Sequence, residues 1–344
     1  MKLDELVRSN ILSLKAYSSA RDEYTGDQAV MLNANENPFT SEVNRYPDPY
    51  QRTLKQEIAK IKGVKPSQIF LGNGSDEAID LLFRIFCEPG EDNIVITEPT
   101  YGMYEVSAGI NDVEIKKASL KEDFSLDANK VIEQVDANTK LIFLCSPNNP
   151  SGNLLDSSEV MRVIEAFDGI VVVDEAYIDF AETTSLIQKM TQFENLVILQ
   201  TFSKAWGMAG VRLGMAFANA NIISYFNKVK PPYNINSLTQ TYALEQLAKR
   251  EQVDEQIAAI KAERKRLEDE LSKFDFVKKL YPSDSNFILV KFDDANRIYN
   301  YLVEKRIIVR DRSKVKFGEN CLRITVGTDA ENILFINALS ALEQ

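Results

Sequence analysis

The feature that most restricts the fold of this chain is a series of short, almost uninterrupted apolar runs. They are rich in β-branched residues and occupy positions 69–72, 93–97, 141–145, 170–174 and 196–200. Such runs are typical of strands that are buried on both faces of a parallel sheet. Segments with helical spacing lie between them, at 75–87, 103–110 and 156–167. The alternation predicts an α/β fold with a mostly parallel central sheet flanked by helices.

The pattern changes after residue 235. Residues 236–274 are charged and helical, with acids and bases spaced for i,i+4 pairing. After them come a strand pattern at 287–292, a helix at 295–304, a strand near 321–326 and a closing helix. We therefore expect three parts: an N-terminal arm and helix over 1–30 that packs with the small domain, a large domain over 31–235, and a smaller α+β domain over 236–344.

The composition excludes several kinds of function. The 344 residues include no histidine, which excludes Ser-His-Asp and Cys-His catalysis, histidine metal ligands and histidine as a proton carrier. We expect no metal site. The 40 Lys and Arg residues against 51 Asp and Glu residues give a net charge of −11, which disfavours binding to a nucleic-acid backbone.

The cysteines and the apolar runs bear on the compartment. Cys87, Cys145 and Cys321 are too few and too far apart for a disulfide framework or a zinc site, so we expect buried, reduced thiols. The N-terminal residues lack the apolar region of a signal peptide, and no apolar run has the length of a membrane span. The sequence predicts a cytoplasmic globular protein.

The strongest local signal is the segment 201–214, TFSKAWGMAGVRLG. Lys204 follows a predicted buried strand and lies among small and apolar residues. Desolvation there lowers the pKa of an amine and frees it to attack a carbonyl group. The small residues leave room for a flat ring, and Arg212 can return to the same site to bind an anion. The alternative for an isolated lysine is a side chain at the edge of the core whose amine reaches solvent.

Two other predicted strands end in residues that suit a binding site. Residues 72–75, GNGS, follow a strand and open a helix whose free N–H groups can bind a phosphate, although Ser75 could instead be a plain N-cap. The carboxylates of Asp76 and Glu77 would repel that phosphate, so we expect them to point away. Asp174 ends the 170–174 run, where a carboxylate is costly unless it is paired or serves a site. Its alternative is an N-cap in the next loop.

The lysine segment resembles the lysine-site signature of fold-type-I pyridoxal-phosphate enzymes, specifically the class-II aminotransferases. Within that group the whole chain is similar to the histidinol-phosphate aminotransferase family. Seven further motifs follow that family's order: NANENP (33–38), RYPD (45–48), GNGSDE (72–77), PTYGMY (99–104), NNPSG (148–152), DEAY (174–177) and LRITVG (322–327). The chain departs from most relatives at Ser151, where they have threonine and this chain lacks only a methyl group.

The resemblance implies that the large domain binds pyridoxal 5′-phosphate. Lys204 would form a Schiff base with it, and Asp174 would keep its ring nitrogen protonated. The cofactor phosphate would be bound by Gly74, Ser75, Asp76, Ser203 and Arg212, with Tyr46 reaching it from a second subunit of a homodimer. Tyr177 and Asn149 would hydrogen-bond the phenolic oxygen of the ring. Tyr101 would stack on the ring, although an aromatic residue in that loop could equally pack in the core.

The family's reaction converts L-histidinol phosphate and 2-oxoglutarate into 3-(imidazol-4-yl)-2-oxopropyl phosphate and L-glutamate in histidine biosynthesis. The resemblance implies a quinonoid intermediate, with Lys204 moving a proton between Cα and C4′, and Asp174 and Tyr177 acting beside it. The implied substrate-binding residues are Tyr17, Asn35, Tyr46, Arg310 and Arg323. Arg310 could instead form a surface ion pair with Asp311 or another neighbour.

Three alternatives stay open. Threonine-phosphate decarboxylases share the fold and an amino-phosphate substrate, and an aromatic aminotransferase would have a similar site. A non-catalytic pyridoxal-binding regulator would need an attached DNA-binding domain, and the first 30 residues are too short and too acidic to supply one.

Overall fold

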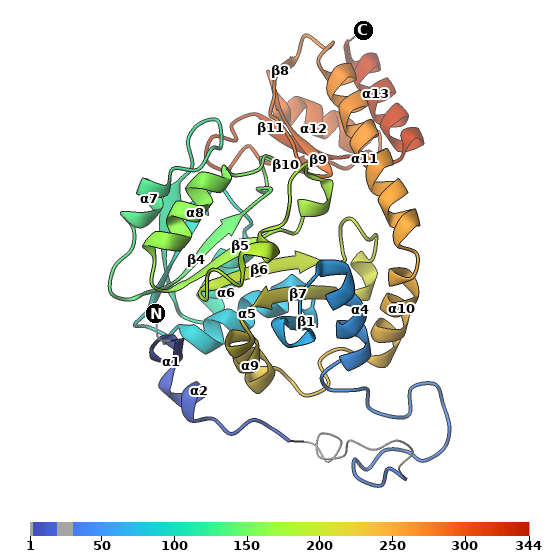
Figure 1. The fold of residues 1–344 in the computed structure, drawn as a ribbon. Helices are drawn as coiled ribbons and strands as arrows, with labels where there is room; N and C mark the ends of the chain where they lie inside the picture. Colours follow the sequence, from blue (N-terminus) through green and yellow to red (C-terminus); the bar gives the residue numbers. More distant parts are fainter. Residues whose placement is uncertain (1–2, 19–29, 344) are drawn as a thin grey trace.

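The computed structural model describes residues 3–18 and 30–343, which form two sheets linked by a helical segment (Figure 1). The larger sheet has the strand order β1-β7-β6-β5-β4-β2-β3. Its strands are β1 (Ile69–Asn73), β2 (Asn93–Glu98), β3 (Glu114–Ser119), β4 (Thr139–Cys145), β5 (Ile170–Asp174), β6 (Leu196–Thr201) and β7 (Leu213–Ala218). Neighbouring strands are parallel from β3 to β6, and β7 runs antiparallel to both β6 and β1. The predicted α/β class and mostly parallel sheet are confirmed.

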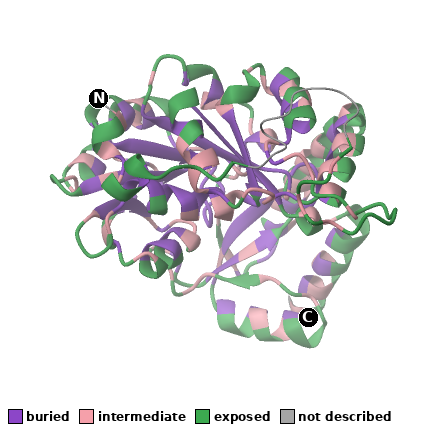
Figure 2. Ribbon diagram, turned by 90° about the horizontal axis from the view of Figure 1, so that it is seen from below, coloured by how far each residue is buried: buried purple, intermediate pink, exposed green. Residues whose placement is uncertain are grey.

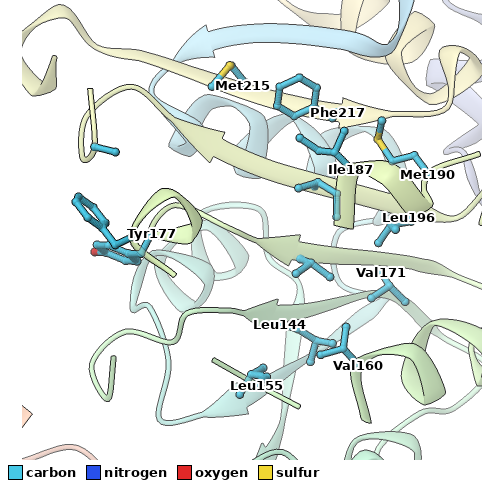
Figure 3. Close-up of a cluster of buried hydrophobic side chains, with 14 of the residues drawn as sticks. Leu144, Leu155, Val160, Val171, Tyr177, Ile187, Met190, Leu196, Met215 and Phe217 are labelled. Atoms are coloured by element: carbon cyan, nitrogen blue, oxygen red, sulfur yellow. The ribbon is translucent and has the colours of Figure 1, made fainter. Parts of the chain in front are cut away.

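The larger sheet is buried on both faces because its central strands are apolar at successive positions. In β5, Val171 and Val173 belong to one buried cluster, and Ile170 and Val172 to a second cluster on the opposite face. The first face is covered by α4 (Arg52–Lys62), α7 (Ala128–Ile132) and α8 (Ser157–Ala166), and the second by α5 (Ser75–Phe86), α6 (Met103–Ile110) and α9 (Ala220–Val229). Figure 2 shows the buried strands between helices whose outer surfaces are exposed. Figure 3 shows part of the first cluster, with Tyr177 at one end.

The described part of the N-terminal arm packs against the large domain. Its helices are α1 (Leu3–Leu6) and α2 (Ser9–Ser13). Val7 and Ile11 join the cluster that contains residues of α5 and α9, and Lys228 Nζ donates to the carbonyl oxygen of Leu12 at 2.9 Å. The expected packing with the small domain therefore differs from what residues 3–18 show, because their apolar side chains face the large domain. The rest of the predicted arm, to residue 29, lies outside the described residues.

The smaller sheet is antiparallel, with the order β10-β11-β9-β8. Its strands are β8 (Val277–Leu280), β9 (Phe287–Phe292), β10 (Arg310–Asp311) and β11 (Cys321–Thr325). Helices α12 (Ala295–Glu304) and α13 (Asp329–Glu343) pack on one face, where Ile288, Val290 and Leu322 are buried with them. The expected α+β character of this region is confirmed.

The helical segment predicted at 236–274 consists of two helices. They are α10 (Ser237–Leu247) and α11 (Arg250–Leu271). Ala243 and Leu247 are buried with the larger sheet, whereas Leu267 and Leu271 are buried with the smaller one. The boundary at residue 235 stays a prediction. The short 3₁₀ turns are Pro66–Gln68, Ile178–Phe180, Leu186–Lys189 and Ala209–Val211. Across residues 3–18 and 30–343, no helix combines the length and the apolar character that a membrane crossing needs.

Candidate active site

A cavity of about 210 Å³ opens where the carboxyl ends of β4, β5 and β6 meet the start of α5. Cys145, Asp174 and Thr201 end these three strands, and all three line it. The strands are parallel neighbours, so their carboxyl ends meet at one edge of the sheet. The complete lining is Gly74, Ser75, Asp76, Tyr101, Cys145, Asn149, Asp174, Ala176, Tyr177, Thr201, Ser203, Lys204, Ala209 and Arg212. Every predicted cofactor-binding residue except Tyr46 is in this set.

One end of the cavity has the chemistry of a phosphate site. Helix α5 starts at Ser75, directly after Gly74, which has a φ of 73°. A Cβ atom on Gly74 would lie 2.7 Å from Arg212 Nη2, so the glycine also leaves room for that guanidinium. The first N–H groups of a helix have no acceptor within it, and the helix dipole adds positive potential there. With Ser203 and Arg212 in the same wall, this end of the cavity attracts an anion.

The two acidic residues of the first turn of α5 take different directions. Glu77 points away, accepting hydrogen bonds from the side-chain amides of Asn73 at 2.9 Å and Asn234 at 3.1 Å, as expected. Asp76 instead stays at the cavity, where it accepts from Tyr101 Oη at 3.1 Å and lies 3.7 Å from Arg212 Nη2. Arg212 therefore offsets the negative charge that Asp76 brings to this end.

Lys204 brings an amine into the cavity. Its Nζ lies 5.5 Å from the centre of the Tyr177 ring. Protein atoms around the side chain, and then the positive charge of Arg323, lower the pKa of the Lys204 amine below its ordinary value. This is the environment that the lysine segment predicts, because a lower pKa leaves more of the amine unprotonated near neutral pH.

Asp174 is a buried carboxylate with two hydrogen bonds. Tyr104 Oη donates to Asp174 Oδ2 at 2.7 Å, and the N–H of Ala176 donates to Oδ1 at 3.0 Å. The bond from the N–H of Ala176 is the one that an N-cap aspartate would make, whereas the bond from Tyr104 is not part of an N-cap. Burial raises the pKa of the Asp174 carboxyl, and the bond from Tyr104 opposes that rise. The sequence interpretation assigned no role to Tyr104, although this residue ends the PTYGMY motif at 99–104 and lies on the buried face of α6.

Two tyrosines of the cavity wall, Tyr101 and Tyr177, contact other aromatic rings. Tyr101 lines the cavity and meets the Tyr104 ring edge to face at 5.6 Å. The ring of Tyr177 meets Phe287 of β9 edge to face at 5.1 Å, so the small sheet reaches this site. Burial raises the pKa of the Tyr177 hydroxyl, which stays a neutral donor.

The predicted substrate residues fall into two groups. Arg323 donates to Asn149 Oδ1, at the cavity, and Arg310 is paired opposite Arg323 between β10 and β11. The others lie elsewhere in the same chain. Asn35 and Tyr46 line a second cavity of about 510 Å³, where the Tyr46 ring stacks on Tyr233 with centroids 4.4 Å apart. Tyr17 is exposed and lines a small third cavity.

The sequence pattern of the family described as aminotransferase class I and II matches residues 16–339. The chain belongs to the class I and II aminotransferases. This aminotransferase is 54% identical over 341 residues to the histidinol-phosphate aminotransferase of Cytophaga hutchinsonii, with 98% of each chain covered. It is also 54% identical to that of Parabacteroides distasonis, with 99% of each chain covered. The predicted family is confirmed.

Solved structures give the same fold. The histidinol-phosphate aminotransferase of Clostridium acetobutylicum is similar with a TM-score of 0.81 and 26% identity, over 88% of this chain and 91% of that one. The L-threonine-O-3-phosphate decarboxylase of Porphyromonas gingivalis is similar with a TM-score of 0.73 and 26% identity, over 87% and 91% of the chains. Fold alone therefore does not separate amino transfer from decarboxylation.

The cavity of this aminotransferase fits pyridoxal 5′-phosphate, the cofactor of the family. It offers three groups that match the three reactive parts of that molecule: an amine for the aldehyde, a helix start with an arginine for the phosphate, and a buried carboxylate for the ring nitrogen. Asp174 has hydrogen-bond donors but, among the described residues, no ion pair. A protonated ring nitrogen would supply the positive charge that this carboxylate lacks.

Proposed function

We propose that this aminotransferase moves the amino group of L-histidinol phosphate to 2-oxoglutarate, giving 3-(imidazol-4-yl)-2-oxopropyl phosphate and L-glutamate in histidine biosynthesis. The observation that carries the proposal is a single cavity that combines the Lys204 amine, the buried Asp174 carboxylate and an anion-attracting helix start, with Arg323 held at its edge by Asn149. The 54% identity to histidinol-phosphate aminotransferases over almost the whole chain supports this choice of substrate.

For the cofactor-binding residues we propose the roles that the resemblance implies. The start of α5, from Gly74 to Asp76, would hold the phosphate together with Ser203 and Arg212. Tyr101 would stack on the ring, and Asn149 and Tyr177 would bond its phenolic oxygen. When bound, pyridoxal 5′-phosphate supplies an aldehyde that accepts the amino group and a ring that withdraws electrons from the reacting carbon. Asp174 would keep the ring nitrogen protonated, which strengthens that withdrawal.

Lys204 would act twice. Its amine would hold the cofactor before substrate arrives, and it would then accept the proton of the substrate Cα and deliver it to C4′ of the cofactor, on the other side of the amino nitrogen. The lowered pKa of Lys204 favours both steps because each needs the unprotonated amine. Tyr177, whose ring lies beside Lys204 Nζ, would help to position that amine.

The substrate anions would be bound from the small sheet and from a second subunit. Arg323 and Arg310 would bind the phosphate of histidinol phosphate and the carboxylate of glutamate in the same place. We propose a homodimer in which Tyr46 reaches the partner's cavity, with Asn35 and Tyr17 adding contacts to the substrate. Large apolar side chains support this: Val30, Leu32 and Phe39 are 86%, 88% and 81% exposed, as in a surface that meets another protein.

We also propose that the enzyme works in the cytoplasm. Its three cysteines are buried as free thiols, the state that a reducing compartment maintains.

The test is to supply purified holoenzyme with L-histidinol phosphate and 2-oxoglutarate, and separately with L-threonine phosphate. Histidinol phosphate has no α-carboxylate to lose, so only amino transfer can consume it. We expect glutamate from the first mixture and no carbon dioxide from the second. Carbon dioxide from threonine phosphate, without turnover of histidinol phosphate, would identify a decarboxylase instead. A better kcat/KM for aromatic amino acids than for histidinol phosphate would identify an aromatic aminotransferase.

A further inference from the structure

Three arginines lie together on one face of the small sheet. Arg310 of β10 is directly opposite Arg323 of β11, and Asp311 is opposite Leu322. The N–H of Arg312 donates to the carbonyl oxygen of Cys321 at 2.9 Å, which continues the pairing by one residue. Side chains alternate between the faces of a strand, so Arg310, Arg312 and Arg323 share a face, and Asp311 does not.

The face that carries these arginines is directed at the active site. Cys321, on the same face, is buried in the cluster that includes Tyr177 and Phe287, whereas Leu322 is buried on the other side with α12 and α13. Arg323 lies over the Phe287 ring, 5.1 Å from its centre, and Phe287 meets the Tyr177 ring. Arg312 lies on the same face as Arg323 by the register of β10 and β11, and its Nε atom is closed off from solvent.

The charges of this cluster are not offset by ion pairs within the described part of the chain. Across residues 3–18 and 30–343, no ion pair joins Arg310, Arg312 or Arg323 to a carboxylate. The Nε atoms of Arg312 and Arg323 are both closed off from solvent and have no hydrogen-bond acceptor. Asp311 accepts instead from the N–H of Ser313 at 2.8 Å. Burial and the charges of Arg323 and Arg310 lower the pKa of Arg312 to about 10, so it still carries its charge near neutral pH.

Such an arrangement costs stability unless an anion fills it. Like charges directly opposite each other in an antiparallel pair are destabilising, and a buried donor without an acceptor costs about 1–3 kcal/mol. A bound anion removes both costs at once.

We propose that Arg312 is a third anion-binding residue of the substrate site and makes that site prefer a phosphate monoester to a carboxylate. This rests on the proposed function. A carboxylate has two oxygens and one negative charge, which Arg323 and Arg310 can satisfy. A phosphate monoester has three terminal oxygens and a charge of about −1.5 to −2 near neutral pH, so it can use a third guanidinium. The residue thus favours the phosphate-bearing substrate within a site that must also accept glutamate.

The test compares Arg312→Gln, Arg312→Lys and the control Lys314→Gln in the holoenzyme, whose cofactor phosphate site is already filled. Lys314 is exposed two residues further along, so its substitution makes the same change in net charge. The first readout is the affinity for inorganic phosphate, measured calorimetrically. We expect Arg312→Gln to weaken it roughly ten- to a hundredfold and Arg312→Lys to weaken it less. Lys314→Gln should stay within about twofold.

The second readout is steady-state kinetics. Arg312→Gln should raise KM for histidinol phosphate by a similar factor, change KM for glutamate by less than about threefold, and leave kcat nearly unchanged. Equal losses for both substrates would overturn the proposal, as would phosphate affinity that falls no further than in Lys314→Gln. If Arg312→Gln does not fold, the Arg312→Lys variant tests the proposal. Lysine keeps the positive charge but lacks the planar guanidinium that binds two oxygens at once, so we still expect phosphate binding to weaken several-fold.

The phosphate titration also separates this inference from the proposed function. If the wild-type holoenzyme does not turn over histidinol phosphate, the proposed function fails. Arg312 is then still judged by whether its substitution weakens the binding of inorganic phosphate.

Discussion

Tyr104 donates its hydroxyl hydrogen to the Asp174 carboxylate across 2.7 Å, and both side chains are buried. Tyr104 comes from α6, and Asp174 is the last residue of β5. The bond stabilises the ionised form of Asp174 against burial, which raises the pKa of that carboxyl. Tyr104 is therefore placed to keep Asp174 charged and fixed in direction at the floor of the cavity.

Removing only that hydroxyl should weaken cofactor binding. Tyr104→Phe keeps the ring packing but leaves Asp174 with one donor fewer, so its pKa rises and its attraction for a protonated ring nitrogen falls. Hydrogen bonds to charged groups contribute about 1.5–3 kcal/mol, so we expect the Kd for pyridoxal 5′-phosphate to rise at least about tenfold. Equilibrium dialysis of the apoenzyme measures this.

Tyr225→Phe is the matched control for this prediction. Tyr225 also donates to an aspartate at 2.7 Å, but at the surface, to Asp4. The Tyr225→Phe substitution should leave the affinity for pyridoxal 5′-phosphate unchanged. Equal Kd values for the two variants would show that the Tyr104 hydroxyl does not act on the cofactor site.

The Tyr104–Asp174 pair also shows where sequence reasoning ends. Asp174 could be predicted because the four successive apolar residues before it indicate a strand buried on both faces, and a carboxylate at the end of such a strand needs a partner. Its partner lies 70 positions away and is set by how α6 packs, which no local pattern records. Strand β3 was missed for a related reason. It lies at the edge of the sheet, and Lys116 and Lys117 interrupt the apolar pattern by which a strand is predicted.

Some residues of the candidate active site could likewise be predicted from their local sequence, and others could not. Lys204 could be predicted from its own segment, because a buried strand precedes it and small residues surround it. Arg312 could not, since its direction depends on the register between β10 and β11, and β10 is only two residues long. Tyr17, Asn35 and Tyr46 were predicted from the resemblance, and a single chain does not bring them to Lys204.

Arg323 should tune the reactivity of Lys204. Its positive charge is the largest contribution after burial to the lowered pKa of the Lys204 amine. A positive neighbour disfavours a second positive charge, so Arg323→Gln should raise that pKa and shift the amine's reactivity to higher pH. In the apoenzyme, acetylation of the peptide containing Lys204, followed by mass spectrometry from pH 6 to 11, measures the shift. Arg310→Gln should leave the midpoint in place, and a shift of equal size there would contradict the assignment.

Gly214 should be irreplaceable for steric reasons. It lies on β7 against the start of α5, and a Cβ atom there would be 2.1 Å from the nitrogen of Ser75 and 2.2 Å from the carbonyl carbon of Gly74. The backbone of the turn that we propose to bind the cofactor phosphate would have to move. We expect Gly214→Ala to lower the free energy of unfolding by about 1–3 kcal/mol and to weaken retention of the cofactor. Gly210→Ala, where no atom lies within 4 Å of the added Cβ, should change the free energy by only a few tenths of 1 kcal/mol. Urea denaturation compares the two variants.

The last prediction concerns Tyr46, which lies outside the Lys204 cavity of its own chain. If it acts in a partner's cavity, a Lys204→Ala chain and a Tyr46→Phe chain should complement each other. A mixed dimer would have one intact site, with lysine from one chain and tyrosine from the other. Random exchange of equal amounts should therefore restore up to about a quarter of the wild-type activity. Lys204→Ala mixed with Asp174→Asn is the control, because both residues belong to one chain's cavity and no mixed dimer has an intact site. Recovery in neither mixture, with subunit exchange verified by mass spectrometry of tagged chains, would mean that Tyr46 does not act across the dimer.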